Sequence, residues 1–295
     1  MYSNDNRLTM AKEGITLLQY FPNKYYHSTL QKNSMPQLEY VCNVDSDASR
    51  MPRSMHSHEH LFEVVLVMDG AGIYMVDGQR YVAKAGDLIF YNGRIVHDEY
   101  GGNGSALSTY CVAISGIQVP NLPPDHLLPR GYSPVQSTHE DFKYIKDLFL
   151  AIEREARTHA EVANYFTLAL IAMLSAFIAE RGVTEEQRIP SLITKARAFI
   201  DKNFKENIRL NDIAAATHTN AYYLSHLFKD EVGLSPMKYV ILRRIGEAQN
   251  LLINTDMTIT QIAAQVGYNN SNYFQNVFKS ALTMTPLEYR KRWTV

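Results

Sequence analysis

Three histidines and one glutamate in this chain have a spacing that suits metal or ligand binding. His56 and His58 are separated by a single residue, Glu63 follows after four more residues, and a second segment runs from Gly86 to His97. Because alternate residues of a strand point to the same side, His56 and His58 would face one site. Imidazole and carboxylate groups are ligands of Mn, Fe, Ni and Zn, so a divalent metal is one interpretation, although the sequence makes no cofactor certain.

The same four side chains have two other interpretations. Histidine also donates hydrogen bonds to organic ligands, so a small metabolite could bind between them without a metal, and they could also be purely structural. Polar groups that point into a barrel need partners, which favours a bound ligand. Aromatic walls with a few polar groups suit a sugar or another small metabolite, and the further candidate ligand-binding residues are Tyr74, Tyr91 and Arg94.

Short apolar segments with turn signals between them must position these residues. Asp-Gly pairs separate several of the segments, and such pairs between β-type segments mark tight hairpin turns. Many short strands with regular turns indicate a β-barrel or jelly roll. The predicted strands are Leu38 to Val44, Glu63 to Val67, Gly72 to Val76, Gln79 to Ala83 and Asp87 to Tyr91.

The stretches from His56 to Gly70 and from Gly86 to His97 resemble the two sequence motifs of the cupin family. This resemblance implies that the histidines and the glutamate converge inside a small β-barrel. The sequence departs from the second motif at Asn92, where cupins usually have proline. The segment YNGRIVHDE, which begins at Tyr91, is similar instead to the sensory cupins attached to AraC-type DNA-binding domains. Those often bind an organic effector, and many of them hold no metal.

Polar side chains also recur near the C-terminus, where two stretches repeat each other. Ile213 to Arg243 and Ile262 to Arg290 align with an offset of 50 residues over most of their length. Each predicts a short helix, a turn and a second helix, which Asn220 and Asn269 are placed to cap. Amides and hydroxyls on an outward helix face suit contacts with DNA base edges, although such a face could also be merely solvated. The candidate DNA-binding residues are Tyr222, Ser225, His226, Lys229, Ser271, Asn272, Gln275, Asn276 and Lys279.

The sequences IAAQVGYNNSNYFQNVFK and TPLEYR, with YYLSHLFKDEVGLSPMKYV before them, resemble the AraC/XylS family of bacterial transcription regulators. The resemblance implies two helix-turn-helix units that share a connecting helix, here about Ser235 to Asn254, and enter adjacent segments of the major groove. It also implies double-stranded DNA and RNA polymerase as partners, with activation as the commoner behaviour. His218 and Thr283 stand where the family usually has glycine, which predicts altered turns, and Gln261 stands where it usually has glutamate.

Composition and charge are those of a soluble protein with two unlike parts. The 295 residues are 46% hydrophobic and 20% charged, and their number suits two domains. Residues 190–295 hold 13 Lys and Arg against 8 Asp and Glu, a net charge of +5, whereas the rest of the chain has a net charge of −6. This asymmetry fits a chain in which the C-terminal domain faces nucleic acid and the N-terminal domain does not.

Compartment and membrane association are predicted from the cysteines and the apolar runs. Cys42 and Cys111 lack metal-site spacing, which indicates reduced thiols in a cytoplasmic protein. The N-terminus has no signal-peptide layout. The longest apolar run, Tyr165 to Ala179, is about five residues short of a membrane span, so we expect a packed helix and no membrane contact.

The expected domain order is a cupin-like sensing and dimerisation domain at 1–182, a linker at 183–190 and an AraC-type DNA-binding domain at 191–295. Prolines between 110 and 139 predict an irregular loop. Two helices with apolar stripes follow between Glu140 and Arg181, and they either pack on the barrel alone or form a homodimer interface, which is the favoured interpretation. The predicted fold class is therefore α+β, a cupin-like jelly-roll barrel with a helical hairpin followed by an all-α domain.

Together these features predict a sequence-specific DNA-binding transcription regulator of the activator type. A small-molecule effector, such as a sugar, would bind among His56, His58, Glu63 and His97 and change the arrangement of the two parts. The alternative is a metal-dependent cupin enzyme fused to a DNA-binding domain, although no enzymatic activity is expected.

Overall fold

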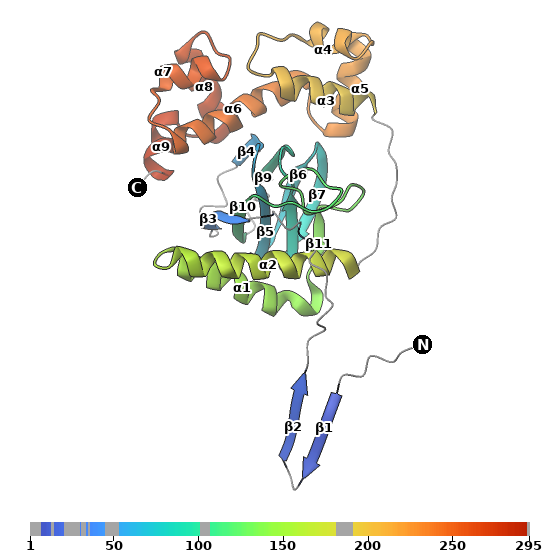
Figure 1. The fold of residues 1–295 in the computed structure, drawn as a ribbon. Helices are drawn as coiled ribbons and strands as arrows, with labels where there is room; N and C mark the ends of the chain where they lie inside the picture. Colours follow the sequence, from blue (N-terminus) through green and yellow to red (C-terminus); the bar gives the residue numbers. More distant parts are fainter. Residues whose placement is uncertain are drawn as a thin grey trace.

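The computed structural model describes residues 7–12, 15–20, 30, 34, 36–44, 53–100, 107–180 and 191–293. A β-rich body lies between a helical hairpin on one side and a C-terminal group of helices on the other (Figure 1). The linker expected at 183–190 lies outside the described residues.

The β-rich body consists of two antiparallel sheets that form a jelly-roll-like barrel, as predicted. The five-stranded sheet has the order β11-β8-β5-β10-β3, the four-stranded sheet has the order β4-β9-β6-β7, and β1 and β2 form a separate hairpin. The strands are β1 (Arg7–Lys12), β2 (Ile15–Tyr20), β3 (Gln37–Val44), β4 (Arg53–His56), β5 (Phe62–Asp69), β6 (Ala71–Val76), β7 (Gln79–Lys84), β8 (Asp87–Tyr91), β9 (His97–Tyr100), β10 (Ser108–Ser115) and β11 (Val135–Ser137).

Strand alternation gives the five-stranded sheet two different faces. Val65 and Val67 of β5 point into the barrel, where they meet Tyr74 and Val76 of the other sheet. Val64 and its outward-facing neighbours instead belong to a second core that includes the helical hairpin. Residue parity along β5 therefore decides which side chains can reach a site inside the barrel.

The five strands predicted from the sequence are confirmed, but the loop predicted at 110–139 is wrong at both ends. β10 crosses the five-stranded sheet between β5 and β3, and β11 pairs with β8. The reason is that the prolines of this region begin only at Pro120, so the apolar segment before it is free to form a strand. On β3 and β10, Cys42 and Cys111 are directly opposite each other, and neither forms a disulfide.

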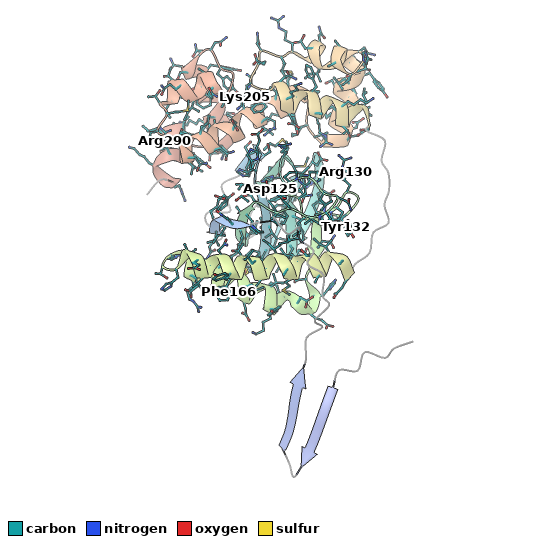
Figure 2. All side chains as sticks on the ribbon, viewed as in Figure 1. Asp125, Arg130, Tyr132, Phe166, Lys205 and Arg290 are labelled. Atoms are coloured by element: carbon teal, nitrogen blue, oxygen red, sulfur yellow. The ribbon has the colours of Figure 1, made fainter. Side chains whose placement is uncertain are left out.

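The helical hairpin is also confirmed, with α1 (Phe142–Ala156) and α2 (Ala160–Glu180) after a short 3-10 turn, η2 (His139–Asp141). Ile145 and Phe149 of α1 and Leu170 and Leu174 of α2 are fully buried against the outer face of the five-stranded sheet. Phe166 packs against the same core (Figure 2). α2 has 21 residues and is long and apolar enough to cross a membrane by length and composition, but this core packing also explains its apolar residues.

The C-terminal part is all-α, and α6 connects two helix-turn-helix units within it (Figure 1). Ser235 caps α6, since its side chain accepts a hydrogen bond from the Lys238 amide, which confirms the predicted connecting helix. The helices are α3 (Leu192–Asn203), α4 (Leu210–Ala216), α5 (Ala221–Val232), α6 (Pro236–Asn254), α7 (Ile259–Gln265), α8 (Ser271–Leu282) and α9 (Pro286–Trp293).

The caps and turns of the two units follow the repeat more strictly than the sequence prediction did. Asn220 caps α5 as predicted, but the prediction for Asn269 is wrong, because Asn270 caps α8 and is the true repeat partner of Asn220. His218 (φ 55°) and Thr283 (φ 62°) keep the left-handed backbone that glycine usually supplies. The altered turns predicted from these two residues are therefore not found. Gln261 still closes a capping box with Thr258.

Candidate functional site

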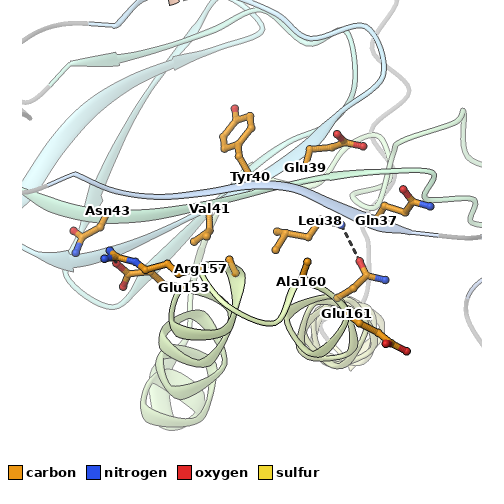
Figure 3. A pocket seen from close by; sticks show the side chains of 12 residues that line it. Gln37, Leu38, Glu39, Tyr40, Val41, Asn43, Glu153, Arg157, Ala160 and Glu161 are labelled. Atoms are coloured by element: carbon orange, nitrogen blue, oxygen red, sulfur yellow. Dashed lines mark hydrogen bonds and ion pairs between the residues drawn. The ribbon is translucent and has the colours of Figure 1, made fainter. Parts of the chain in front are cut away.

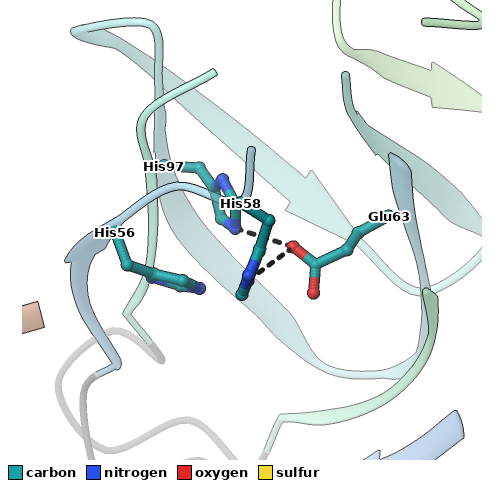
Figure 4. Close-up of side chains that lie close together, drawn as sticks. All are labelled: His56, His58, Glu63 and His97. Carbon is teal, nitrogen blue, oxygen red and sulfur yellow. Dashed lines mark ion pairs between the residues drawn. The ribbon is translucent and has the colours of Figure 1, made fainter. Parts of the chain in front are cut away.

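The predicted histidines and glutamate converge inside the barrel, although they come from different strands (Figure 4). His56 ends β4 and His97 begins β9, and the two residues are directly opposite each other in the sheet. His58 follows β4, and Glu63 points inward from β5. One ligand atom from each of the four lies within 4.8 Å of the others. His56, Glu63 and His97 are at most 2% exposed.

Backbone carbonyls fix the orientation of two of the imidazole rings. Nδ1 of His56 lies 2.9 Å from the Ser54 carbonyl oxygen, and Nδ1 of His97 lies 2.9 Å from that of Ile95. Because a carbonyl oxygen only accepts hydrogen bonds, each Nδ1 carries the proton. In the neutral ring Nε2 then offers a lone pair, and a backbone partner on the other nitrogen is the usual arrangement of metal-binding histidines.

The contact between His97 and Glu63 requires a proton or a metal ion between the two atoms. Nε2 of His97 is 3.0 Å from Oε2 of Glu63, and Nε2 of His58 is 3.5 Å from the same oxygen. A lone pair on Nε2 cannot face a carboxylate oxygen at this distance unless a proton or a metal ion lies between them. Three imidazoles and a carboxylate whose ligand atoms converge within 4.8 Å are suitable ligands for a divalent ion, so the donor set fits a metal.

A further hydrogen bond holds the carboxylate from a strand two positions away on the same face of the sheet. The Tyr40 hydroxyl donates to Oε1 of Glu63, and it reaches across Ala113, which lies between β3 and β5. The Cys111 thiol lies 3.8 Å from the same oxygen. Sequence analysis missed Tyr40 because only the register of three strands brings it beside Glu63.

The other predicted ligand-binding residues lie at different depths. The Tyr91 ring stacks on His97, with 3.9 Å between the ring centroids and 8° between the planes, and Tyr74 is buried in the same interior. The Arg94 side chain is exposed, while its backbone N–H donates to the His58 carbonyl at 2.7 Å. At the position where cupins usually have proline, the Asn92 side chain bonds the backbone of Leu127 and Leu128 and so anchors the neighbouring loop.

A larger opening lies outside this cluster, between β3 and the turn of the helical hairpin (Figure 3). Its volume is about 810 Å³, with Leu38 and Val41 beside the carboxylates of Glu39, Glu153 and Glu161. Tyr40 lies on the strand that borders this groove, but its ring points away from the two helices, and its hydroxyl bonds Glu63 (Figure 3). None of the histidines predicted to bind a ligand lines the groove.

The predicted DNA-facing side chains form matching surfaces on α5 and α8. Leu224 and Phe228 of α5 are buried, as are Phe274 and Phe278 of α8, so both helices turn the same face inward. The neighbouring Tyr223 and Tyr273 are 52% and 59% exposed and were not predicted, although their offset of 50 pointed to equivalent places. The exposed predicted residues are Tyr222, His226, Lys229, Asn272, Asn276 and Lys279, and Ser225, Ser271 and Gln275 are half-buried.

Comparisons with known proteins match both parts of the chain. A family model for the AraC-like ligand binding domain matches residues 41–171, and one for a helix-turn-helix domain matches residues 213–292. The HTH-type regulator YdiP of Escherichia coli is 25% identical over 258 residues, which is 84% of each chain. The activator RhaS of Klebsiella pneumoniae is 25% identical over 254 residues, 82% of this chain and 90% of that one. The crystal structure of ToxT from Vibrio cholerae is 14% identical with a TM-score of 0.46, covering 90% of this chain and 99% of that one.

Proposed function

The chain belongs to the AraC family of helix-turn-helix transcription regulators, and we propose that it senses its effector through a divalent metal ion held by His56, His58, Glu63 and His97. It is a DNA-binding regulator controlled by a small molecule, as its relatives and its two domain types indicate. We place the sensing domain at 1–182, the linker at 183–190 and the DNA-binding domain at 191–295.

One observation carries the metal assignment: four ligand atoms, one each from three imidazoles and one carboxylate, lie within 4.8 Å of one another. The centroids of the His56 and His97 rings are 4.3 Å apart, so the space among the four side chains suits an ion better than a sugar ring. An ion that prefers six ligands would keep positions for oxygen donors of the effector. We therefore propose an effector with hydroxyl or carboxylate oxygens that binds next to the ion, near Tyr74 and Tyr91.

Metal content of the purified full-length protein tests this assignment. We expect about one Mn, Fe, Ni or Zn ion per chain by elemental analysis, with at least roughly tenfold weaker retention in His58→Ala. His60→Ala is the matched control, because its side chain is 74% exposed and contacts Glu59 instead of the cluster. A wild-type protein that binds none of these metals after reloading, or equal retention by the two variants, would overturn the metal site.

The DNA-reading surfaces are proposed to be the outward faces of α5 and α8. Tyr222, Ser225 and His226 would face bases from the first unit, and Lys229 would contact phosphate. Lys279 would do the same in the second unit. The corresponding base-facing side chains of α8 are Ser271, Asn272, Gln275 and Asn276.

The remaining partners follow from the same family assignment and from the exposed face of the helical hairpin. Tyr144 is 62% exposed and Tyr165 is 60% exposed, and Val162 and Leu150 of the same two helices are 40% and 37% exposed. We propose that a second copy of the chain covers these residues, giving a cytoplasmic homodimer that activates transcription together with RNA polymerase. We propose no enzymatic role, and a metal-loaded protein that chemically converts its effector would favour the cupin-enzyme alternative.

A further inference from the structure

The strand that carries His56 is also a docking surface for the DNA-binding part of the chain. β4 lies against α6, where the Ser54 amide donates to Oε1 of Gln249 at 2.8 Å. The Ser54 hydroxyl donates to the Leu242 carbonyl at 3.0 Å. Gln249 is only 1% exposed, so these bonds are inside a closed interface.

Arg243 of α6 completes this interface with its guanidinium group. It donates to the Met55 carbonyl at 3.1 Å and to the Ser57 hydroxyl at 3.4 Å, and its Nε bonds Asp201 at 2.8 Å. Arg243 is 4% exposed. Two of its contacts go to Met55 and Ser57, the residues on either side of His56. Removing these partners would leave a buried charge with fewer hydrogen bonds, which is unfavourable.

Strand alternation connects the ligands directly to the DNA-binding core. His56 and His97 point into the barrel, so the residues just before them, Met55 and Val96, point outward. Both of these side chains belong to the buried core of the first helix-turn-helix unit, together with residues such as Ile193. Two of the four ligands therefore directly follow, in the sequence, side chains that hold the DNA-binding part in place.

A second connection runs through the turn between β6 and β7. Arg197 of α3 donates to the Asp77 carbonyl and forms an ion pair with its carboxylate at 3.0 Å. The Asp77 amide in turn donates to the carbonyl of Val96 at 2.8 Å. The path from α3 to His97 thus consists of an ion pair, one backbone bond and one peptide unit.

Gly246 shows that the close approach of α6 to β4 is a specific feature of this helix. A Cβ at this position would overlap the Met55 carbonyl and crowd the Ser54 carbonyl, and the three nearest atoms all belong to these two residues of the barrel. Glycine inside a helix is otherwise unfavourable relative to alanine. The position therefore serves contact with the barrel and not the stability of α6 itself.

We propose that filling the site at His56, His58, Glu63 and His97 stabilises the docked arrangement of α6 on β4, so that the bound site controls where the DNA-reading helices are held. This inference rests on the proposed metal site. A ligand on Nε2 of His56 fixes the ring and strengthens its Nδ1–H bond to the Ser54 carbonyl. The backbone amide of the same Ser54 donates to Gln249 of α6. By linkage, docking must raise the affinity of the site by the same factor.

Gly246→Ala in the full-length protein is the decisive variant, because it blocks docking while it favours the helix. We expect its Zn²⁺ affinity, measured by competition with a chromogenic chelator, to fall about fivefold or more, and small-angle X-ray scattering to show a larger radius of gyration. Gln249→Ala, which removes the bond to Ser54 and leaves Gly246 in place, should give a smaller loss in the same direction. The control Glu247→Ala, which only breaks the Lys205 ion pair, should match the wild type.

The outcomes separate this inference from the metal site itself. Equal Zn²⁺ affinity in the wild type and in an extended Gly246→Ala protein would overturn the coupling and leave the metal site standing. A Gly246→Ala protein as compact as the wild type would contradict the role given to Gly246. If the wild type binds no Zn²⁺, the proposed metal site fails first.

Discussion

The first helix-turn-helix unit packs against the barrel, whereas the second draws its buried core from its own part of the chain. Met55 and Val96 of the barrel lie in the core of the first unit. The core of the second unit is made of residues between Ile241 and Tyr289. Two copies of one structural pattern can therefore pack against different neighbours, because a helix pair needs only one of its faces for its own core.

The two units also divide their left-handed residues differently. In the first, histidine occupies the turn at His218 and glycine ends α5 at Gly233, while in the second, glycine occupies the turn at Gly267 and threonine ends α8 at Thr283. All of these residues have positive φ. The backbone shape is thus kept in both copies, and each copy carries one strained residue at a different place.

The outward faces differ in chemistry as well. Tyr222 and His226 of α5 pack on each other with ring centroids 4.4 Å apart, while the equivalent Asn272 and Asn276 of α8 offer amides. An amide can bond adenine through two atoms at once, whereas an imidazole offers one hydrogen bond. The comparison therefore suggests that the second unit contributes most of the sequence reading.

Gly267→Ala should cause the largest effect, since the new Cβ would overlap the Lys205 carbonyl at a φ of 90°. Left-handed strain and overpacking together should lower the free energy of unfolding by roughly 2–5 kcal/mol. Urea unfolding followed by circular dichroism measures this. A loss below about 1 kcal/mol would show that the turn relaxes freely and that the second unit is not held as tightly as its core indicates.

The matched change in the first unit is His218→Gly, which should act in the opposite direction. The change removes left-handed strain but also adds entropy to the unfolded chain. We therefore expect the free energy of unfolding to rise by about 0.5–1 kcal/mol. Thr283→Gly should give a similar gain in the second unit. A loss in either variant would mean that the side chain makes contacts which outweigh its backbone strain.

The repeat explains how much of the DNA-binding part could be predicted. The offset of 50 gave the buried faces of α5 and α8 correctly, and its strict use would also have given Asn270 in place of Asn269 as the cap. The β-barrel followed from alternation and turns. Tyr40 could not be predicted, because its contact with Glu63 depends on the register of three strands.

The docking of α6 on β4 also left no signal in the sequence. Met55 lies in the short strand β4 and Val96 lies just before β9, so neither belongs to a periodic pattern. Gly246 in mid-helix was the one visible irregularity. Local sequence identifies elements and their faces, but contacts between separate elements depend on a fold that only the whole chain specifies.

Asn276→Ala should weaken binding to a selected operator by roughly 1–3 kcal/mol, the range for a two-atom contact with one base. The equivalent change in the first unit, His226→Ala, should cost about 0.5–1.5 kcal/mol, because it removes one neutral hydrogen bond. Fluorescence anisotropy at fixed salt measures both, with the exposed Asn207→Ala as control. Equal losses in the two units would remove the proposed difference in reading.

Acidification should also distinguish the two units, and of the changes considered it should have the smallest effect on stability. Glu288 closes the start of α9 by accepting hydrogen bonds from the Thr285 amide at 2.7 Å and its hydroxyl at 2.9 Å, and these bonds lower the pKa of its carboxyl below the ordinary 4.5. The first unit has Lys238 at the equivalent place, with Ser235 as its cap. A depressed carboxyl pKa contributes stability that is present above the unfolded value and lost as pH falls through the folded one.

Between about pH 6 and about pH 3 the start of α9 should therefore loosen, while the start of α6 keeps its cap. Amide hydrogen exchange, corrected for its intrinsic pH dependence, should show faster exchange at Thr285 at the acidic end and little change at Lys238. Glu288→Gln keeps an acceptor without titrating, so it should abolish the pH dependence of Thr285. Loosening of both starts together in the wild type would instead indicate loss of the whole domain, and the difference between the two copies would then have no part in the acid response.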